Sequence, residues 1–87
     1  MTWKIIYTKE SKNDFEKFNN KEKSKVRKLI EILLSNPYEF CAYFKRLRGS
    51  PTMYSRRISQ KHRLVYEINK EKRVVKVLSM WGHYDDN

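Results

Sequence analysis

The sequence predicts an α+β domain with the element order β-α-α-β-β-β-β, in which two N-terminal helices pack on one face of an antiparallel twisted sheet. The chain has 87 residues, which is enough for one core, so residues 1–87 are taken as a single domain. Helical periodicity is confined to the first part of the chain, and short β-branched and aromatic runs separated by turn residues follow it. A sheet covered on one face by helices leaves its other face free to bind a partner.

The first predicted element is a strand over residues 3–8 (WKIIYT), which is rich in β-branched and aromatic side chains. The two isoleucines at its centre are expected to be buried. A short helix should follow, because Ser11 can cap it and Asp14 then lies in its first turn, where negative charge suits the helix dipole. Phe15 and Phe18 would share one face of this helix.

The second predicted helix has the clearest pattern in the sequence. Its apolar positions recur at i, i+3, i+4, i+7 and i+8, which is one stripe of a helix over residues 21–35. The helix should end at Asn36, because Pro37 pushes the residue before it out of the helical region. The stripe consists of Val26, Leu29, Ile30, Leu33 and Leu34.

The remaining chain predicts four strands that pair as an antiparallel meander. Residues 38–59 are interrupted by turn residues at 49–51 and predict two strands, and residues 62–69 and 73–84 predict two more, joined by a turn at 69–72. The last strand carries apolar residues on both faces and is therefore expected to lie inside the sheet. Aromatic residues assigned to the core by default are Tyr38, Tyr43, Phe44 and Tyr54.

Alternation along the strands predicts which side chains share a face. Arg63 and Val65 should lie on one face and His62 and Leu64 on the other, more apolar face, which is assigned to the helix-covered side. His62 and Arg63 are therefore not expected to cooperate directly. Gly82 could relax the last strand so that the side chains after it reach one pocket. The two sets of the last strand are Val75, Val77, Ser79, Trp81 and His83, and Val74, Lys76, Leu78, Met80, Gly82 and Tyr84.

Positive charge is concentrated in the middle of the chain. The sequence has 20 Lys and Arg against 10 Asp and Glu, a net charge of +10, and no acidic residue lies between Glu39 and Glu67. This distribution favours a polyanionic partner, with nucleic acid first and an acidic protein second. Arginine predominates in the segment, and its planar fork suits phosphate. The candidate RNA-binding residues are Lys45, Arg46, Arg48, Arg56, Arg57 and Lys61, and Arg63 completes the basic set.

Cysteine content and hydropathy narrow the class of protein. The single Cys41 excludes an intramolecular disulfide framework and a cysteine-based zinc cluster. No apolar run approaches the roughly 18 to 20 residues that span a bilayer, and no signal peptide is recognisable, so the cytoplasm is the expected location. We expect no metal, no cofactor and no membrane partner.

The basic segment together with the C-terminal residues has the composition needed for RNA cleavage without a metal. Attack of the 2′-hydroxyl on the adjacent phosphate requires removal of a proton, neutralisation of a phosphorane and protonation of the leaving oxygen. His83 can move the proton and Arg63 can pair with the phosphate oxygens. Tyr84 can stack on a base or hydrogen-bond a phosphate. The catalytic candidates are therefore Arg63, His83 and Tyr84.

Three segments resemble the signature of the YoeB/Txe toxins of the RelE superfamily: residues 54–58 (YSRRI), residues 62–66 (HRLVY) and the pair His83-Tyr84. The resemblance implies the RelE-like microbial ribonuclease-type fold, cleavage of messenger RNA at the ribosomal A site, and inhibition by an acidic antitoxin of the YefM/Axe type. It assigns transition-state stabilisation to Arg63, the scissile phosphate to the C-terminal pair, and RNA binding to Arg48. Dimers occur in that family, so the resemblance also allows a homodimer.

One position departs from the family pattern. The family commonly has a glutamate, proposed as the general base, where alignment on Leu47-Arg48 places Lys45 in this chain. Three explanations follow: His83 removes the 2′-proton, Glu39 folds in from the preceding loop, or this chain cleaves RNA slowly. The first is favoured, because related toxins rely on electrostatics and on the ribosomal RNA.

Two other functions compete with a toxin endoribonuclease. A non-enzymatic RNA- or ribosome-binding domain could block translation sterically. A DNA-binding regulator is less favoured, because the sequence has no helix-turn-helix with a basic second helix facing outward.

Overall fold

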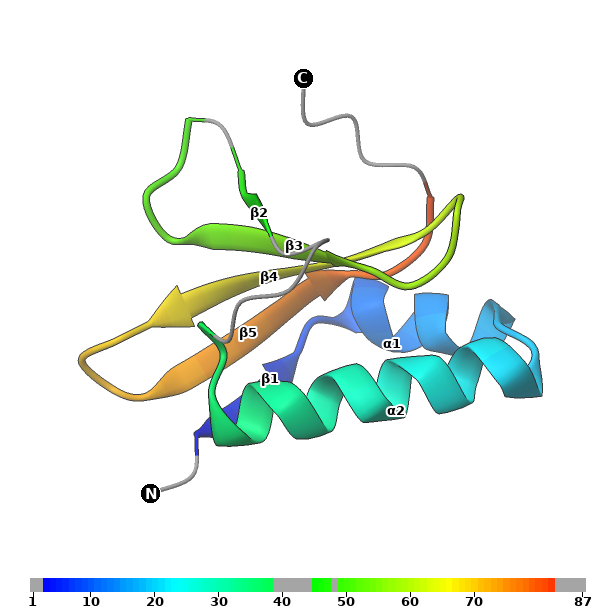
Figure 1. Ribbon diagram of the computed structural model, residues 1–87, viewed down its shortest axis with the longest axis horizontal. Coiled ribbons are helices and arrows are strands. Elements are labelled where there is room, and N and C mark those ends of the chain that lie inside the picture. The colour runs from blue at the N-terminus through cyan, green and yellow to red at the C-terminus, as the bar shows by residue number, and fades with distance from the viewer. Residues whose placement is uncertain (1–2, 39–44, 48, 83–87) are drawn as a thin grey trace.

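The computed structural model describes residues 3–38, 45–47 and 49–82. They form one mixed sheet with both helices on the same side of it (Figure 1). The predicted order β-α-α-β-β-β-β is confirmed. The elements are β1 (Lys4–Tyr7), α1 (Lys9–Lys17), α2 (Asn20–Ser35), β2 (Lys45–Arg46), β3 (Met53–Arg57), β4 (Arg63–Asn69) and β5 (Val74–Ser79). None of the described helices is long and apolar enough to cross a membrane.

The sheet has the strand order β1-β5-β4-β3-β2. Strands β2 to β5 form the predicted antiparallel meander, and β5 lies between two neighbours as expected. The prediction of a fully antiparallel sheet was wrong, because β1 pairs with β5 in parallel, from Lys4 opposite Val74 to Tyr7 opposite Val77. Parallel neighbours need a long crossover, and here α1, α2 and the meander provide it. The parallel direction brings the start of α1 to the end of β5.

Helix α1 begins three residues earlier than predicted. Thr8 has an extended backbone and its Oγ1 accepts the Ser11 amide proton at 3.1 Å, so Thr8 is the N-cap in place of Ser11. Glu10 occupies the first turn. Asp14 therefore lies in the body of the helix, and the structure buries it to 5% exposure. The sequence assigned Asp14 to the wrong turn because two nearby residues could each cap the helix.

Helix α2 follows its prediction closely. Asn19 and Glu22 form a reciprocal capping box, with the Glu22 amide donating to Asn19 Oδ1 at 2.8 Å and the Asn19 amide donating to Glu22 Oε1 at 3.2 Å. The Asn36 amide makes the last helical bond, to the Ile32 carbonyl at 2.7 Å. Proline at the next position ends the helix as predicted.

The core lies between the helices and the covered face of the sheet. Its members are Trp3, Phe18, Val26, Leu29, Leu33, Ile58, Leu64, Tyr66, Ile68, Val75, Val77 and Met80. The burial predicted for the centre of β1 was wrong: Ile5 is half-buried and Ile6 is 39% exposed, because β1 is an edge strand. Tyr38 is exposed and Tyr54 packs against the core from its margin, while Tyr43 and Phe44 fall outside the described residues.

An irregularity in the β4–β5 ladder changes which residues of the last strand are buried. Val65 pairs with Ser79 but Tyr66 pairs with Val77, so Leu78 is an extra residue. One extra residue reverses the alternation beyond it. Met80 is therefore 2% exposed with Val75 and Val77, although simple alternation placed it on the opposite face.

The stripe on α2 generates a stability prediction. Leu33 is fully buried whereas its neighbour Leu34 is 37% exposed. Leu33→Ala should lower the free energy of unfolding by about 2–5 kcal/mol, because it removes buried methyl groups and leaves a cavity. Leu34→Ala, the matched control, should cost about 1 kcal/mol or less. Urea denaturation followed by circular dichroism measures both, and equal losses would contradict the assigned helix face.

Candidate functional site

Two arginines face each other where β3 and β4 meet their connecting turn. Arg57 pairs directly with Arg63 in the antiparallel ladder, and residues 58–62 connect them. Their side chains leave the same face of the sheet, about 5 Å apart at Cβ. Leu64, the next residue of β4, is buried under the helices, so the arginines belong to the face that the helices leave uncovered, which we call the open face, as predicted for Arg63. Ser55 and Val65, which pair with each other on this face, are nevertheless buried. With exposed Lys61 in the turn, the two arginines form what we call the basic cluster: Arg57, Lys61 and Arg63.

Like charges directly opposite each other destabilise a sheet. The fold nevertheless holds two guanidinium groups at this one rung of the ladder. Two arginines can each offer paired donors to the oxygens of a phosphate. The basic cluster therefore has the charge and the geometry of an anion site.

Arg63 is fixed in place by backbone carbonyls. Its Nη1 donates to the carbonyl of Ser59 at 2.7 Å and to that of His62 at 3.2 Å, with a longer contact of 3.5 Å to Gln60. The side chain is half-buried. These contacts engage Nη1, and a guanidinium has further donors on Nε and Nη2. The β3–β4 turn thus orients Arg63 while leaving it donors for a ligand.

Arg56 does not belong to this surface. Its side chain is 1% exposed on the helix-covered face, where its Nε donates to the Tyr66 hydroxyl at 3.0 Å. That hydroxyl donates to the Pro37 carbonyl at 3.4 Å. A buried guanidinium needs such partners. Counting charges along a continuous segment included Arg56, whereas strand alternation turns it inward next to outward-facing Arg57.

The remaining predicted RNA contacts have different positions. Arg46 is exposed on β2 and pairs with Tyr54, which places it on the opposite sheet face from the basic cluster. Lys45 pairs with Ser55 through the backbone, and nothing further is described for it. Predictions for Arg48, His83 and Tyr84 fall outside the described residues.

Two side chains that the sequence analysis did not select hold the chain just after β5. Asp14 Oδ2 accepts the amide protons of Met80 at 3.0 Å and Trp81 at 3.2 Å. His62 Nδ1 accepts the amide proton of Gly82 at 2.8 Å. We call Asp14 and His62 the C-terminal clamp. One sequence signal could have found Asp14, which lies with Ser11, Phe15 and Phe18 on the apolar stripe of α1.

His62 also links this clamp to the basic cluster. Its ring is 9% exposed and packs against Trp81, with ring centroids 4.2 Å apart, and against Phe18 at 5.2 Å. Its carbonyl accepts protons from the Ile58 and Ser59 amides and from Arg63 Nη1. The predicted separation of the His62 and Arg63 side chains onto opposite faces is confirmed. His62 nevertheless bonds to both neighbours of the site: its carbonyl accepts from Arg63 and its ring accepts from Gly82. In Figure 1 the β3–β4 turn accordingly lies beside the end of β5.

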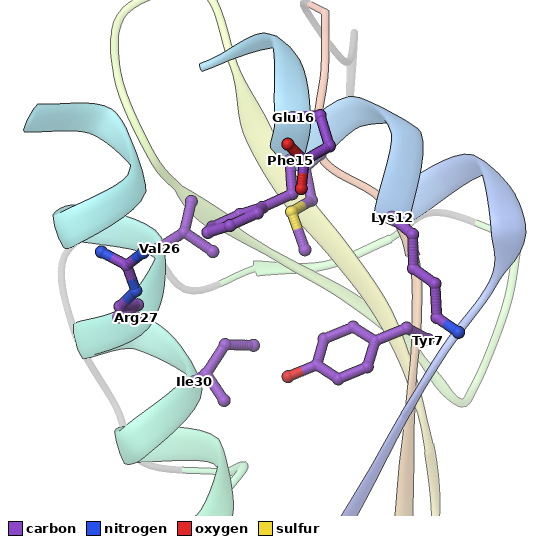
Figure 2. Close-up of a pocket in the computed structure, with 8 residues that line it drawn as sticks. Tyr7, Lys12, Phe15, Glu16, Val26, Arg27 and Ile30 are labelled. Atoms are coloured by element: carbon purple, nitrogen blue, oxygen red, sulfur yellow. The ribbon is translucent and has the colours of Figure 1, made fainter. Parts of the chain in front are cut away.

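Two cavities lie away from the basic cluster. One, of about 400 Å³, is enclosed by α1, α2 and the end of β1, and Figure 2 shows Tyr7, Phe15, Val26 and Ile30 converging on it. Burial raises the pKa of the Tyr7 phenol above its ordinary value. The other, of about 500 Å³, adjoins the β4–β5 turn. Within residues 3–38, 45–47 and 49–82, no group of three His, Cys, Asp or Glu side chains could hold a metal ion.

Solved structures share this architecture over nearly the whole chain. The YoeB/ParE toxin from Agrobacterium tumefaciens superposes with a TM-score of 0.83 at 26% identity, covering 93% of this chain and 99% of that one. The YoeB dimer from Staphylococcus aureus superposes with a TM-score of 0.81 at 26% identity, covering 94% of this chain and 98% of that one. The matching chain of the YoeB-YefM complex from the same species superposes with a TM-score of 0.76 at 28% identity, covering 94% of this chain and 98% of that one.

Sequence comparison leads to the same group. Curated protein sequences include no match to this chain. A family model described as the YoeB-like toxin of bacterial type II toxin-antitoxin systems matches residues 7–84, which spans all the helices and strands after β1 and both parts of the candidate site. This chain therefore belongs to the YoeB-like toxins of bacterial type II toxin-antitoxin systems, within the RelE superfamily.

Proposed function

We propose that this toxin is a ribosome-associated, metal-independent mRNA endoribonuclease that inhibits translation. The observation that carries the proposal is the placement of Arg63. It is fixed on the open sheet face opposite Arg57, and it is bonded through His62 to the segment that leads into His83. Cleavage of a phosphodiester by an adjacent hydroxyl requires a group that binds the phosphate and a group that moves the proton, and the proposal assigns these roles to Arg63 and His83.

Each catalytic candidate has a proposed role. Arg63 donates to the non-bridging oxygens of the phosphate as the phosphorane forms, and Arg57 adds positive charge from the facing strand. His83 accepts the proton from the 2′-hydroxyl, which then attacks phosphorus. The 5′-oxygen leaves with a proton from water, and a 2′,3′-cyclic phosphate remains. Tyr84 stacks on a base beside the scissile bond.

RNA binding is proposed to spread from the basic cluster toward the β2–β3 edge. Lys61 and Arg57 would contact phosphates nearest the cleaved bond, and Arg46, on the other face of edge strand β2, would contact the RNA only where it passes around that edge, with Lys45 and Arg48 on the same segment of the sequence. The burial of Arg56 removes it from the proposed RNA surface and gives it a structural role instead.

The proposed inhibitor is a cognate acidic antitoxin of the YefM/Axe type. YoeB of Staphylococcus aureus is found in a complex with YefM, and a basic cluster of the kind seen here offers an acidic segment the same charges that it offers RNA. Bound antitoxin would then exclude substrate. We also propose a cytoplasmic location, where ribosomes are available, and a homodimer, as found for YoeB of that species.

A second candidate function is supported by Lys45. Where the family commonly has a glutamate proposed as the base, this chain has a lysine. A toxin without that carboxylate could bind the ribosome and block translation without cutting RNA. The two functions differ in one product, because only cleavage generates new 2′,3′-cyclic phosphate ends.

Substitution of the catalytic candidates provides the direct test. Arg63→Ala should lower the rate of mRNA cleavage on ribosomes by about 10²- to 10³-fold, as loss of one preorganised donor does, and His83→Ala by about 10²- to 10⁴-fold. Both should relieve the growth arrest that follows expression without antitoxin. RNA end mapping with a 2′,3′-cyclic phosphate-specific ligation measures cleavage.

The matched control is Lys72→Ala, which removes an exposed cation from the β4–β5 turn at the far end of the sheet. It should cleave at the parent rate. If message stays intact while parent protein stalls ribosomes, steric blocking replaces cleavage as the function. If both catalytic variants cleave like the parent, the assigned residues are wrong.

The basic cluster also generates a salt-dependence prediction. In a His83→Ala background, which keeps RNA intact, Lys61→Ala should weaken binding to single-stranded RNA regardless of sequence. The slope of log K against log salt should fall by about 0.7, because the variant neutralises one phosphate fewer. Fluorescence anisotropy over a salt series measures the slope, with Lys72→Ala as the control. An unchanged slope for Lys61→Ala would exclude that residue from the RNA surface.

A further inference from the structure

Three backbone amides in succession are held by two side chains from distant parts of the sequence. Asp14 on α1 accepts the protons of Met80 and Trp81, and His62 before β4 accepts the proton of Gly82. The lengths of these bonds, 2.8 to 3.2 Å, are those of well-formed N–H donors. Consecutive amides bonded in this way fix both the position and the direction of the backbone after β5.

The two acceptors are costly residues to bury in a small core. Asp14 is 5% exposed and His62 is 9% exposed. Burial of a carboxylate is unfavourable unless it is well hydrogen-bonded. An apolar side chain on α1 would fill the same stripe without that cost. The use of two buried polar groups on one short backbone segment indicates that its exact placement matters.

Gly82 adds a third constraint on the same segment. Its φ is +104°, in the region that side chains other than glycine rarely adopt, and a Cβ built at this position would meet nothing within 4 Å. Glycine is therefore required at this position by the positive φ of the backbone and not by a lack of space for a side chain. Gly82 therefore turns the chain out of the line of β5 at the residue whose amide His62 holds.

The clamp is bonded to the anion site through His62. The ring of His62 accepts from Gly82, and its carbonyl accepts from Arg63 Nη1 at 3.2 Å. The next residues in the sequence after Gly82 are His83 and Tyr84. His62 thus relates the position of the Arg63 guanidinium to that of Gly82, which directly precedes the proposed catalytic pair in the sequence.

We propose that His62 and Asp14 are positioning residues for RNA cleavage: they fix Gly82, the residue before the proposed catalytic pair, relative to the Arg63 guanidinium. This inference rests on the proposed function. Neither residue contacts the substrate. Loss of the clamp should lower kcat, because misplacement of a catalytic group by about 1 Å can cost about a hundredfold in rate, while RNA affinity from the basic cluster stays intact.

The test compares three full-length variants. His62→Leu removes the acceptor and keeps an apolar side chain between Phe18 and Trp81. His62→Asn keeps an acceptor oxygen at the position of Nδ1. Gly82→Ala leaves side-chain packing untouched and strains the backbone at positive φ. Cleavage of message on ribosomes gives kcat and KM, and NMR hydrogen exchange reports whether the Gly82 amide is protected.

We expect His62→Leu and Gly82→Ala to lower kcat by about tenfold or more with KM changed by less than about twofold. Protection of the Gly82 amide should be lost in His62→Leu. His62→Asn should restore most of kcat together with that protection, a rescue that a merely structural role does not produce. Gly82→Ala keeps the inference testable if His62→Leu fails to fold.

Parent activity in both His62→Leu and Gly82→Ala would overturn the inference and leave the ribonuclease function standing. Equal loss in His62→Leu and His62→Asn, with Gly82 still protected in the asparagine variant, would also overturn it. A parent protein that makes no cyclic phosphate ends would overturn the proposed function itself, and the positioning role with it.

Discussion

The end of β5 is the part of the chain on which the rest of the structure depends, because separate elements are hydrogen-bonded to it residue by residue. The Thr8 amide donates to the Val77 carbonyl and the Thr8 hydroxyl to the Leu78 carbonyl, which ties β1 and the start of α1 to this strand. Asp14 and His62 then hold the amides that follow. The parallel pairing of β1, the placement of α1 and the position of the β3–β4 turn are therefore set against the same short segment, residues 77–82.

The arginine side chains of β3 and β4 lie in two different environments, one at the surface and one in the interior. Arg57 and Arg63 lie opposite each other across one rung of the sheet, whereas Arg56 on the helix-covered face is buried with the Tyr66 hydroxyl. The high net charge of the middle segment therefore overstates the charge that lies at the surface. Under the proposed mechanism a smaller number of fixed guanidinium groups would stabilise the transition state, because preorganised donors are worth more than mobile ones in water.

The missing family glutamate is easier to understand in this setting. Cleavage by an adjacent hydroxyl depends on stabilising the phosphorane as well as on a base, and the proposed mechanism assigns that stabilisation to Arg63, which three carbonyl groups of the β3–β4 turn hold in place. Under the proposed mechanism, loss of a carboxylate at position 45 also removes a negative charge that would repel the substrate. Under that mechanism Lys45 would not act as the base that a glutamate provides, but its positive charge would attract RNA.

The sequence by itself determined the order of the elements, the stripe of α2, the meander and the open face of β4, because each follows from local periodicity and turn chemistry. The burial of Leu33 and the sheet face of Arg63 were assigned correctly for this reason. Local patterns contain no information on which strand takes the free edge of β5, so the parallel pairing of β1 was decided only by tertiary structure. The extra residue at Leu78 likewise reversed the alternation and buried Met80. The clamp of Asp14 and His62 could not be predicted for the same physical reason. Its hydrogen bonds join Asp14 to Met80, 66 positions apart, and His62 to Gly82, 20 positions apart, and such bonds exist only once the chain has folded.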